Sequence, residues 1–397
     1  MPKRPVDERG GGRTAKLPSR ERRHLYLVLD DWELGYSIRK VDLSLSADAL
    51  DVEHSHLKED EDNAVDRTKQ RLPPAVFRLE APHAHSGLFT SFGTKIMFLG
   101  RHSSPWGSAP LFDVRTRSLT SIPLPESEPN PYCSAYLQVD GKFFLLDDTN
   151  FEMLQPHPLL DRGPAVGWSW LALPEPSYHD VVSYVMHPDE RTIFVSMVKQ
   201  SLVHTKLATL SFDPVSSKWT RHGAWGLPFK GRGYFDHNLD AWVGLSCGDL
   251  GYLCACKVLS ANAHHKQPPA SKLSKEKLFC VDPVEKHIGA TLVYIGGGSR
   301  FCLVQCLFID GSQGGTKETQ PEHLRYLLRV TTFLLKYDEN GDLRVTKHCL
   351  GFLKGCPVED VENNRVSSSS MSMWTRSKSG NALADNKDGQ VVTFQIL

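Results

Sequence analysis

The sequence predicts an all-β protein of the β-propeller class, with six blades favoured, seven possible, and disordered loops between strands. Three observations lead to this prediction. Apolar and polar residues alternate with a period of two, turn-forming residues separate these segments, and an Asp recurs after the apolar strands. Many short hairpins at regular intervals are typical of a sandwich, a barrel or a propeller. Because the 397-residue chain holds more strand candidates than one sandwich needs, the propeller is favoured.

The strand candidates are rich in Val, Ile, Leu, Phe and Tyr and are bounded by Gly, Pro, Asp or Asn. In chain order they are His24–Leu29, Ser37–Leu43, Val76–Leu79, Lys95–Leu99, Tyr136–Val139, Lys142–Leu146, Val181–Met186, Thr192–Met197, Thr209–Phe212, Ala241–Gly244, Lys277–Val281, Thr291–Ile295, Phe301–Phe308, Leu327–Leu335 and Val391–Ile396. We expect the last strand to pair with the first, because closing the ring removes exposed sheet edges.

Turn residues support the hairpins between these strands. Asp140-Gly141, Pro188-Asp189 and Asn340-Gly341 tolerate positive φ or preset a turn. A weak internal repeat adds an Asp directly after an apolar strand end, at Phe112-Asp113, Phe212-Asp213, Val281-Asp282 and Tyr337-Asp338. We interpret these carboxylates as turn acceptors for a backbone N–H two residues later, in preference to catalytic groups.

Four tryptophans lie on predicted strands or return strands. We expect them to fill space between blades rather than to bind a ligand. They are Trp168, Trp170, Trp219 and Trp242.

Composition divides the chain into two parts. Residues 1–23 hold eight Lys or Arg against three Asp or Glu and several Gly and Pro, which predicts a disordered basic arm. Residues 24–397 are predicted to form a single propeller domain with a flexible charged insertion at 51–71. Residues 260–276, 310–323 and 355–370 are expected to be further loops. The arm could contact nucleic acid or direct nuclear import, but a solvated leader is favoured.

The totals limit the location and the partners of the protein. Lys plus Arg and Asp plus Glu are both 46, so the net charge is zero and nucleic-acid binding is unlikely as a main function. No apolar run reaches the length that spans a bilayer, and the N-terminus has no apolar signal core. The odd number of nine cysteines favours a reducing compartment. We therefore expect a cytoplasmic or nuclear protein that is not secreted and has no membrane partner.

No residue constellation carries a standard chemistry. Cys254 and Cys256 would share one face of a strand, and His264-His265 is the nearest second pair, but this spacing matches no standard zinc site. Two such cysteines more often pack as small apolar side chains. Gly296–Gly298 lacks the Lys-Ser/Thr of a phosphate loop, and no nucleophile elbow or zinc-protease motif occurs. The sequence therefore predicts no catalytic residue, no metal and no cofactor.

The sequence resembles kelch-like β-propellers, and more closely an uncharacterised family found mainly in grasses and labelled domain of unknown function 1668. The segments that carry the resemblance are RRHLYLVLDDWELGYSIRKVDL at 22–43, LPPAVFRLEAP at 72–82, FTSFGTKI at 89–96, PLFDVRTRSLTSIPLP at 110–125, VVSYVMHPDERTIFVS at 181–196, SFDPVSSKWTRHGAWGLPFKGRGYFDHNLDAWVGL at 211–245 and YIGGGSRFCLV at 294–304. The resemblance implies a propeller fold and supplies no catalytic residues.

The leading functional prediction is a non-catalytic protein-interaction module with an unidentified protein partner. Propellers present loops from every blade on one face, and aromatic and Arg residues are enriched at interfaces. Trp106, Trp225, Arg232 and Tyr234 lie in segments rich in Pro and Gly and are the candidate contact residues, with loop or blade-edge packing as the competing interpretation. The alternative is an enzyme that acts on a small molecule or glycan at the propeller channel. The oligomeric state is left open.

Overall fold

The computed structural model describes residues 24–31, 35–43, 69–80, 88–100, 108–126, 129, 134–148, 150–156, 167–200, 205–279, 285–309, 325–354 and 393–396. Several predictions fall outside these ranges. They are the basic arm 1–23, residues 51–68 of the charged insertion, the loops 310–323 and 355–370, the Val281-Asp282 turn and Trp106.

The described residues form strands and turns with no helix, in agreement with the predicted all-β class. The strands belong to five hydrogen-bonded sheets. The first has the order β25-β1-β2-β4, with bounds Thr393–Ile396, His24–Asp30, Tyr36–Asp42 and Ala75–Leu79. The second has the order β5-β6-β7-β8, with bounds Leu88–Phe92, Lys95–Leu99, Ser108–Asp113 and Leu119–Pro123. The third has the order β12-β11-β10-β9, with bounds Trp168–Ala172, Phe151–Pro156, Lys142–Leu146 and Ala135–Val139.

The two remaining sheets are larger. The eight-stranded sheet has the order β16-β15-β14-β13-β17-β18-β19-β20, with bounds Lys218–Gly223, Thr205–Asp213, Ile193–Gln200, Asp180–Met186, Phe229–Asp236, Ala241–Ser246, Leu253–Lys257 and Ser271–Leu273. The five-stranded sheet has the order β21-β22-β23-β24-β3, with bounds Glu285–Gly296, Arg300–Ile309, Arg325–Tyr337, Leu343–Lys354 and Lys69–Arg71.

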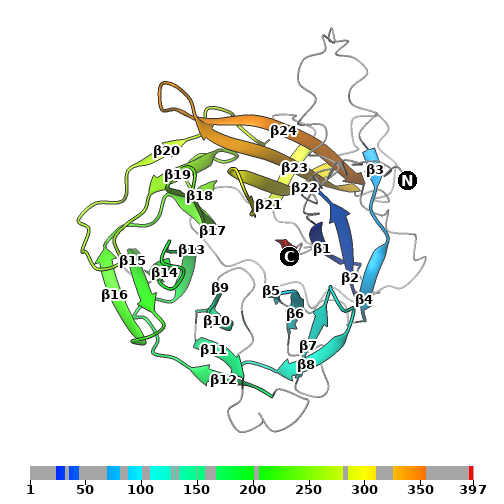
Figure 1. Ribbon diagram of the computed structural model, residues 1–397, viewed down its shortest axis with the longest axis horizontal. Helices are drawn as coiled ribbons and strands as arrows, with labels where there is room; N and C mark the ends of the chain where they lie inside the picture. Colours follow the sequence, from blue (N-terminus) through cyan, green and yellow to red (C-terminus); the bar gives the residue numbers. More distant parts are fainter. Residues whose placement is uncertain are drawn as a thin grey trace, which may run out of the picture.

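The sheets follow one another around a ring, which is the propeller arrangement predicted from the sequence (Figure 1). The predicted closure is confirmed, because β25 pairs antiparallel with β1 from Leu25↔Ile396 to Val28↔Thr393. This pairing joins the two ends of the described chain in one sheet. Among the described residues there is no helix with the length and apolarity that a membrane crossing requires.

The predicted number of six or seven blades is not confirmed by the sheet count. The strands of β13–β16 and β17–β20 each form an antiparallel unit, but β13 and β17 are also hydrogen-bonded in parallel through two residue pairs, Ser183↔Gly231 and Tyr184↔Arg232. This seam merges two units into one sheet. A contact of two residue pairs has no local sequence pattern, so the sequence could not predict the merger.

The strand predictions differ from the structure in two ways. Within Lys277–Val281, the described residues 277–279 form no strand, and Leu278 N–H instead donates to Gly251 O at 2.8 Å. The strands missing from the prediction are β5, β7, β8, β11, β12, β16, β17, β19, β20 and β24. Lys69–Arg71, counted with the charged insertion, forms the short strand β3. Outer strands are half exposed and carry mixed residues, which weakens their pattern.

The recurring Asp residues are turn acceptors, as predicted. Asp113 Oδ1 accepts from Arg115 N–H at 2.9 Å and Thr116 N–H at 3.2 Å. Asp213 Oδ1 accepts from Val215 N–H at 3.1 Å, and Asp338 Oδ1 from Asn340 N–H at 3.0 Å. Each carboxylate therefore closes the hairpin that follows its strand.

The strand tryptophans join neighbouring parts of the ring. Trp170 Nε1–H on β12 donates to Pro123 O at the end of β8 at 2.8 Å, and Trp219 Nε1–H on β16 donates to Pro174 O at 2.7 Å. Trp242 is fully buried, and its Nε1–H donates to Met186 O of β13 at 3.1 Å. Trp168 on β12 packs against Phe92 of β5, with ring centroids 5.3 Å apart. The prediction that the four pack between blades is confirmed, and Trp170, Trp219 and Trp242 also donate a hydrogen bond across their interfaces.

Candidate functional site

The inner rim of the ring is formed by one terminal strand of each antiparallel unit. In the sheet orders these strands are β25, β5, β9, β13, β17 and β21. Residues of β25 contact β5 and β21, and residues of β9 and β17 contact β13. Figure 1 shows these strands around the central opening, with the label of the C-terminus near its middle.

Strand β17, Phe229–Asp236, has an irregular backbone where it meets β13. Its register with β18 shifts between Lys230 and Tyr234, and Gly231 adopts a φ of +71°. Only Gly takes this φ without strain, which explains the Gly in the middle of a strand. The shifted segment is the part of β17 that pairs with β13, so it carries Arg232 next to Tyr184.

A tyrosine–arginine cluster lies on these inner strands. Its members are Tyr136 on β9, Tyr184 on β13, Arg232 and Tyr234 on β17, and Tyr294 on β21. The rings of Tyr136 and Tyr184 have centroids 6.0 Å apart, and their side chains are hydrogen-bonded to each other. The Arg232 guanidinium carbon lies 5.1 Å from the centroid of the Tyr234 ring, and the Tyr234 and Tyr294 rings are 6.2 Å apart.

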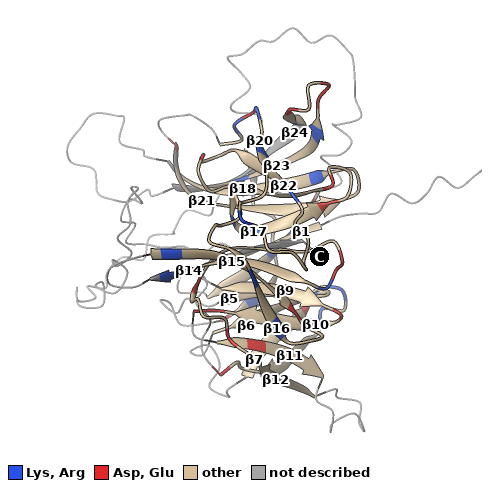
Figure 2. Ribbon diagram, turned by 90° about the vertical axis from the view of Figure 1, so that its left-hand side faces the viewer, with Lys and Arg blue, Asp and Glu red and all other residues tan. Residues whose placement is uncertain are grey.

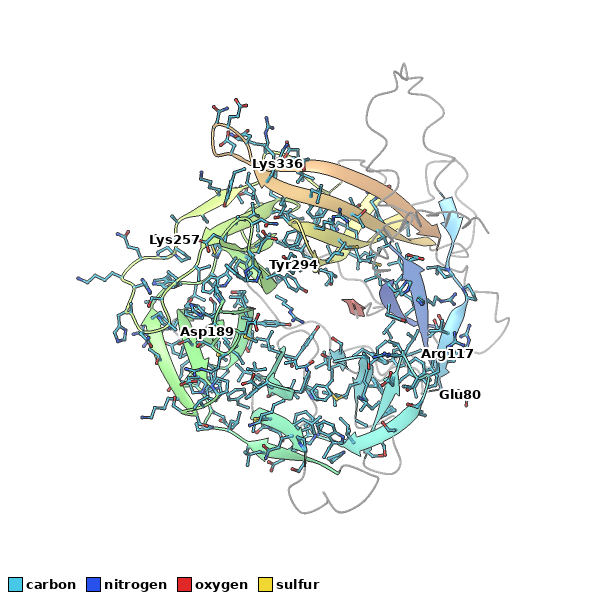
Figure 3. The ribbon with its side chains drawn as sticks, in the orientation of Figure 1. Glu80, Arg117, Asp189, Lys257, Tyr294 and Lys336 are labelled. Atoms are coloured by element: carbon cyan, nitrogen blue, oxygen red, sulfur yellow. The ribbon has the colours of Figure 1, made fainter. Side chains whose placement is uncertain are left out.

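The cluster is deep in the molecule but not sealed. Tyr184 is 5% exposed, whereas the other four side chains are half-buried. Figure 3 shows Tyr294 at the inner side of the ring, whereas Lys257, Lys336 and Glu80 lie toward its outside. Four of the five cluster side chains therefore keep part of their surface exposed in the described part of the structure.

Arg232 carries the only formal charge of the cluster, and no carboxylate of the described residues forms an ion pair with it. Its Nε atom is buried without a hydrogen-bond partner among these residues. Burial opposes the charge on Arg232, and the phenols of Tyr234, Tyr184 and Tyr136 outweigh this, so its pKa is raised. An unpaired guanidinium removed from water is costly unless an anion or hydrogen-bond acceptor meets it.

The phenols of the cluster remain neutral at ordinary pH. Burial raises the pKa of Tyr136 and Tyr234, and it raises the pKa of Tyr184 well above its usual value. Neutral phenols donate and accept hydrogen bonds but do not neutralise a cation. The chemistry offered by Arg232 and these three phenols is therefore the binding of an acceptor group rather than proton transfer near neutral pH.

The four predicted contact residues have different environments. Arg232 and Tyr234 lie together on the inner rim, on a strand rather than in the expected loop. Trp225 is 7% exposed and packs in a core cluster with Phe194 and Trp242, and its Nε1–H donates to His265 O at 2.9 Å. Trp225 therefore does not belong to the cluster. Trp106 lies outside the described residues.

Tyr136, Tyr184 and Tyr294 were not predicted as site residues. Each lies in a segment that was predicted as a strand, and the one shared signal is a Tyr on the innermost strand of successive units. Which terminal strand of an antiparallel unit lies innermost depends on how the ring closes. For this reason the residue pattern alone could not select them.

The cysteine pair on β19 is buried. Cys254 and Cys256 are each 1% exposed, and Cys256 packs against Trp242 and Phe229. Burial raises the pKa of Cys254 to about 11 and raises the pKa of Cys256 further. Both thiols are therefore protonated at neutral pH, whereas metal ligation needs thiolates. In the described part of the chain, no group of three His, Cys, Asp or Glu side chains is placed to hold a metal ion.

Charged residues outside the cluster are distributed over the described part of the ring. Figure 2 shows the Lys, Arg, Asp and Glu residues of the described part scattered along strand ends and turns on the side of the ring that faces the viewer. Several are paired, such as Arg344 with Glu276 at 2.9 Å and with Asp338 at 3.1 Å. Arg232 differs from these surface cations, because the described residues form no ion pair with it.

The chain is similar to several solved structures at low identity. One is TolB from Acinetobacter baumannii, at 13% identity and a TM-score of 0.41, covering 83% of this chain and 66% of that chain. A periplasmic gluconolactonase from Pseudomonas aeruginosa has 11% identity and a TM-score of 0.41, with 84% and 99% covered. A putative 6-phosphogluconolactonase from Bacteroides uniformis has 10% identity and a TM-score of 0.39, with 84% and 100% covered.

The lactonase names correct one prediction made from the sequence. A conclusion that the chain is not an enzyme was drawn from the fold and from missing motifs. Two of the similar structures are lactonases by their titles, so this conclusion is wrong as it stood, because neither the fold nor a missing motif excludes catalysis. The likeness is too low to assign their activities to this chain.

The sequence comparisons identify the chain at the level of family. No curated protein matches it. The match to a family extends over residues 22–351, which is most of the chain and includes all five residues of the tyrosine–arginine cluster. The chain therefore belongs to the family described as protein of unknown function (DUF1668).

Proposed function

We propose that this chain is a protein-recognition module whose contact surface is the inner rim around the tyrosine–arginine cluster. One observation carries the proposal: Arg232 is a guanidinium without a counter-ion among the described residues, surrounded by phenols from neighbouring inner strands. Tyr and Arg are the residue types that most often dominate binding energy when they lie in a desolvated position.

The arrangement of the cluster supports a binding role over a purely structural one. A structural arginine in the interior normally pairs with a carboxylate, as Arg329 does with Glu285 at 2.6 Å in this protein. Arg232 has no such partner among the described residues, and its guanidinium lies over the Tyr234 ring instead. A partner that supplies the acceptor would stabilise the charge and bury the half-exposed aromatic surface together.

We also propose the kelch-like form of the ring that the sequence resemblance implies. The eight-stranded sheet would then count as two blades, β13–β16 and β17–β20, in a six-bladed ring. Both halves are four-stranded antiparallel units, and the strand pairing between them is limited to two residue pairs. In this arrangement the tyrosine–arginine cluster lies at the seam where the two blades meet.

A selection experiment tests the recognition proposal. Peptides are selected from a random displayed library on the full-length chain, and their affinity is then compared between the wild type and the Tyr234→Ala variant. The proposal expects a loss of about tenfold or more, because truncation of a central aromatic contact removes buried apolar area. Thermal unfolding of the variant confirms that it is folded.

The matched control is Arg221→Gln, on the exposed outer strand β16. This variant should bind the selected peptides as the wild type does. Peptides that bind Tyr234→Ala and the wild type equally, or a library that yields no specific peptide, would contradict a recognition surface at the inner rim.

A further inference from the structure

We propose that Arg232 binds one carboxylate group of the ligand, held by the edge of its guanidinium at the seam between β13 and β17. This inference deepens the proposed function and rests on it for the position of the binding surface. It adds the chemical class of the group that is recognised.

The first step concerns charge. Arg232 is half-buried, its Nε–H has no acceptor among the described residues, and no ion pair to it is formed by them. The neighbouring groups Tyr136, Tyr184 and Tyr234 are neutral, as shown above. The cluster therefore presents one uncompensated positive charge, and the group that completes it carries negative charge.

The second step concerns geometry. The guanidinium carbon lies over the Tyr234 ring, 5.1 Å from its centre. The N–H donors of a guanidinium point outward in its own plane, and the Nε–H of Arg232 on this edge is buried with no acceptor among the described residues. A carboxylate matches this edge with two parallel N–H···O bonds.

The charge of the cluster favours a carboxylate over a phosphate group as the ligand of Arg232. A carboxylate carries one negative charge, which the single charge of Arg232 neutralises. A phosphate monoester carries close to two charges at neutral pH, and the cluster has no second cation among its five members. A dianion would therefore remain partly unpaired in a desolvated place, which costs free energy.

The phenols add orientation. Tyr184 lies directly beside Arg232 across the β13–β17 seam, and its side chain is hydrogen-bonded to Tyr136. The two hydroxyls have two O–H donors, and the hydrogen bond between them uses one. The other O–H can donate to an oxygen of the ligand. The aromatic rings of Tyr234 and Tyr294 offer apolar contact to whatever carries the carboxylate.

The test uses benzoate, benzamide and inorganic phosphate as probes on the full-length chain. The reporter is the Nε–Hε resonance of Arg232 in nitrogen–proton correlation spectra, assigned as the peak that disappears in Arg232→Lys. Benzoate should shift this resonance saturably, and benzamide, which has the same shape without the charge, should not. Phosphate should bind at least about tenfold more weakly than benzoate, since it brings the unpaired second charge.

The same titration followed by calorimetry should show loss of benzoate binding in Arg232→Gln and unchanged binding in the exposed control Arg221→Gln. A resonance that does not respond to benzoate, an equal response to benzamide, tighter binding of phosphate, or retained binding in Arg232→Gln would each overturn the carboxylate site. Retained melting temperature in Arg232→Gln shows that a loss is not caused by unfolding.

Two sets of peptides distinguish an acidic side chain from a chain terminus as the source of the carboxylate. They also test protein recognition separately from the carboxylate site. One set carries an internal Glu and an amidated C-terminus, and a second set has no acidic residue but a free C-terminal carboxylate. Binding of the first set identifies an acidic side chain as the ligand group, and binding of the second identifies a chain terminus. If benzoate binds through Arg232 and neither set binds, the carboxylate site stands and protein recognition is contradicted.

Discussion

At the scale of single residues, the turn aspartates show how one side chain ends a strand and begins a hairpin. The Asp residues were predicted as turn acceptors from their position after an apolar segment, and the hydrogen bonds of Asp113, Asp213 and Asp338 confirm it. This prediction succeeded because an Asx turn depends on neighbouring residues alone.

Asp113 allows a test of this turn chemistry through pH. Burial opposes its charge, but the N–H groups of Thr116 and Arg115 hold its pKa below the usual value. A lowered pKa stabilises the fold above about pH 4, and this contribution is lost as pH falls through the folded-state pKa. Asp113→Asn should therefore lower the free energy of unfolding by about 1–2 kcal/mol at pH 7 and by less in acid.

Urea unfolding at pH 7 and in acid measures the difference between Asp113→Asn and the wild type. Asp240→Asn is the control, because Asp240 is exposed and its side chain forms no hydrogen bond with the described residues. This control should change stability by less than about 0.5 kcal/mol. A difference for Asp113→Asn that grows on acidification would contradict the assigned role.

The site residues were predictable only in part at this scale. Arg232 and Tyr234 were chosen because Arg and Tyr are common interface residues, and they do lie together. Trp225 was chosen on the same basis but is buried in the core. Residue type alone does not distinguish a side chain that packs between blades from one that contacts a partner, because large aromatic side chains occur in both positions.

At the scale of elements, β17 is the strand that the sequence pattern concealed. The run Phe229-Lys230-Gly231-Arg232-Gly233-Tyr234 reads as a loop, because Gly is unfavourable inside a strand. In the structure the glycines have specific functions: Gly231 adopts positive φ, and Gly233 leaves room for the Phe229 ring. The strand that carries Arg232 therefore needs Gly231 and Gly233, and these same glycines interrupt the alternation by which a strand is recognised in the sequence.

Phe229 gives a direct test of this packing. It is fully buried, and a Cβ at Gly244 would lie 2.5 Å from its Cγ and 2.6 Å from its Cβ. These atoms are close to the backbone of β17 and cannot move away easily. Gly244→Ala should lower the free energy of unfolding by about 1–3 kcal/mol, the usual cost of overpacking a core.

Gly248→Ala is the matched control for Gly244→Ala, because nothing lies within 4 Å of a Cβ there and its φ is not positive. It should leave the free energy of unfolding nearly unchanged. Equal stability of the two variants in urea unfolding would show that Phe229 does not fill the space assigned to it.

At the scale of the whole molecule, ring closure is the feature that the sequence predicted best. An open propeller would leave unpaired strand edges at both ends, and the last apolar segment is the natural partner of the first. The observed β25–β1 pairing follows this logic. The number of sheets could not be predicted from the sequence. It depends on the two residue pairs between β13 and β17, which form where the register of β17 shifts.

Deletion of residues 393–397 tests the contribution of closure. The deletion removes four residue pairs between β25 and β1, and each hydrogen bond contributes about 1 kcal/mol. The melting temperature should fall by about 5 °C or more. Deletion of residues 1–23, which precede β1, should leave it unchanged, and equal melting temperatures for the two truncations would contradict the closure.

Anion binding at Arg232 on the inner rim can be tested with a crystal structure of the full-length chain grown with benzoate. A carboxylate should be bonded in the plane of the Arg232 guanidinium, between β13 and β17, with the benzoate ring against Tyr234 or Tyr294. An Arg232 already paired with a carboxylate of its own chain, and no benzoate beside it, would contradict the claim.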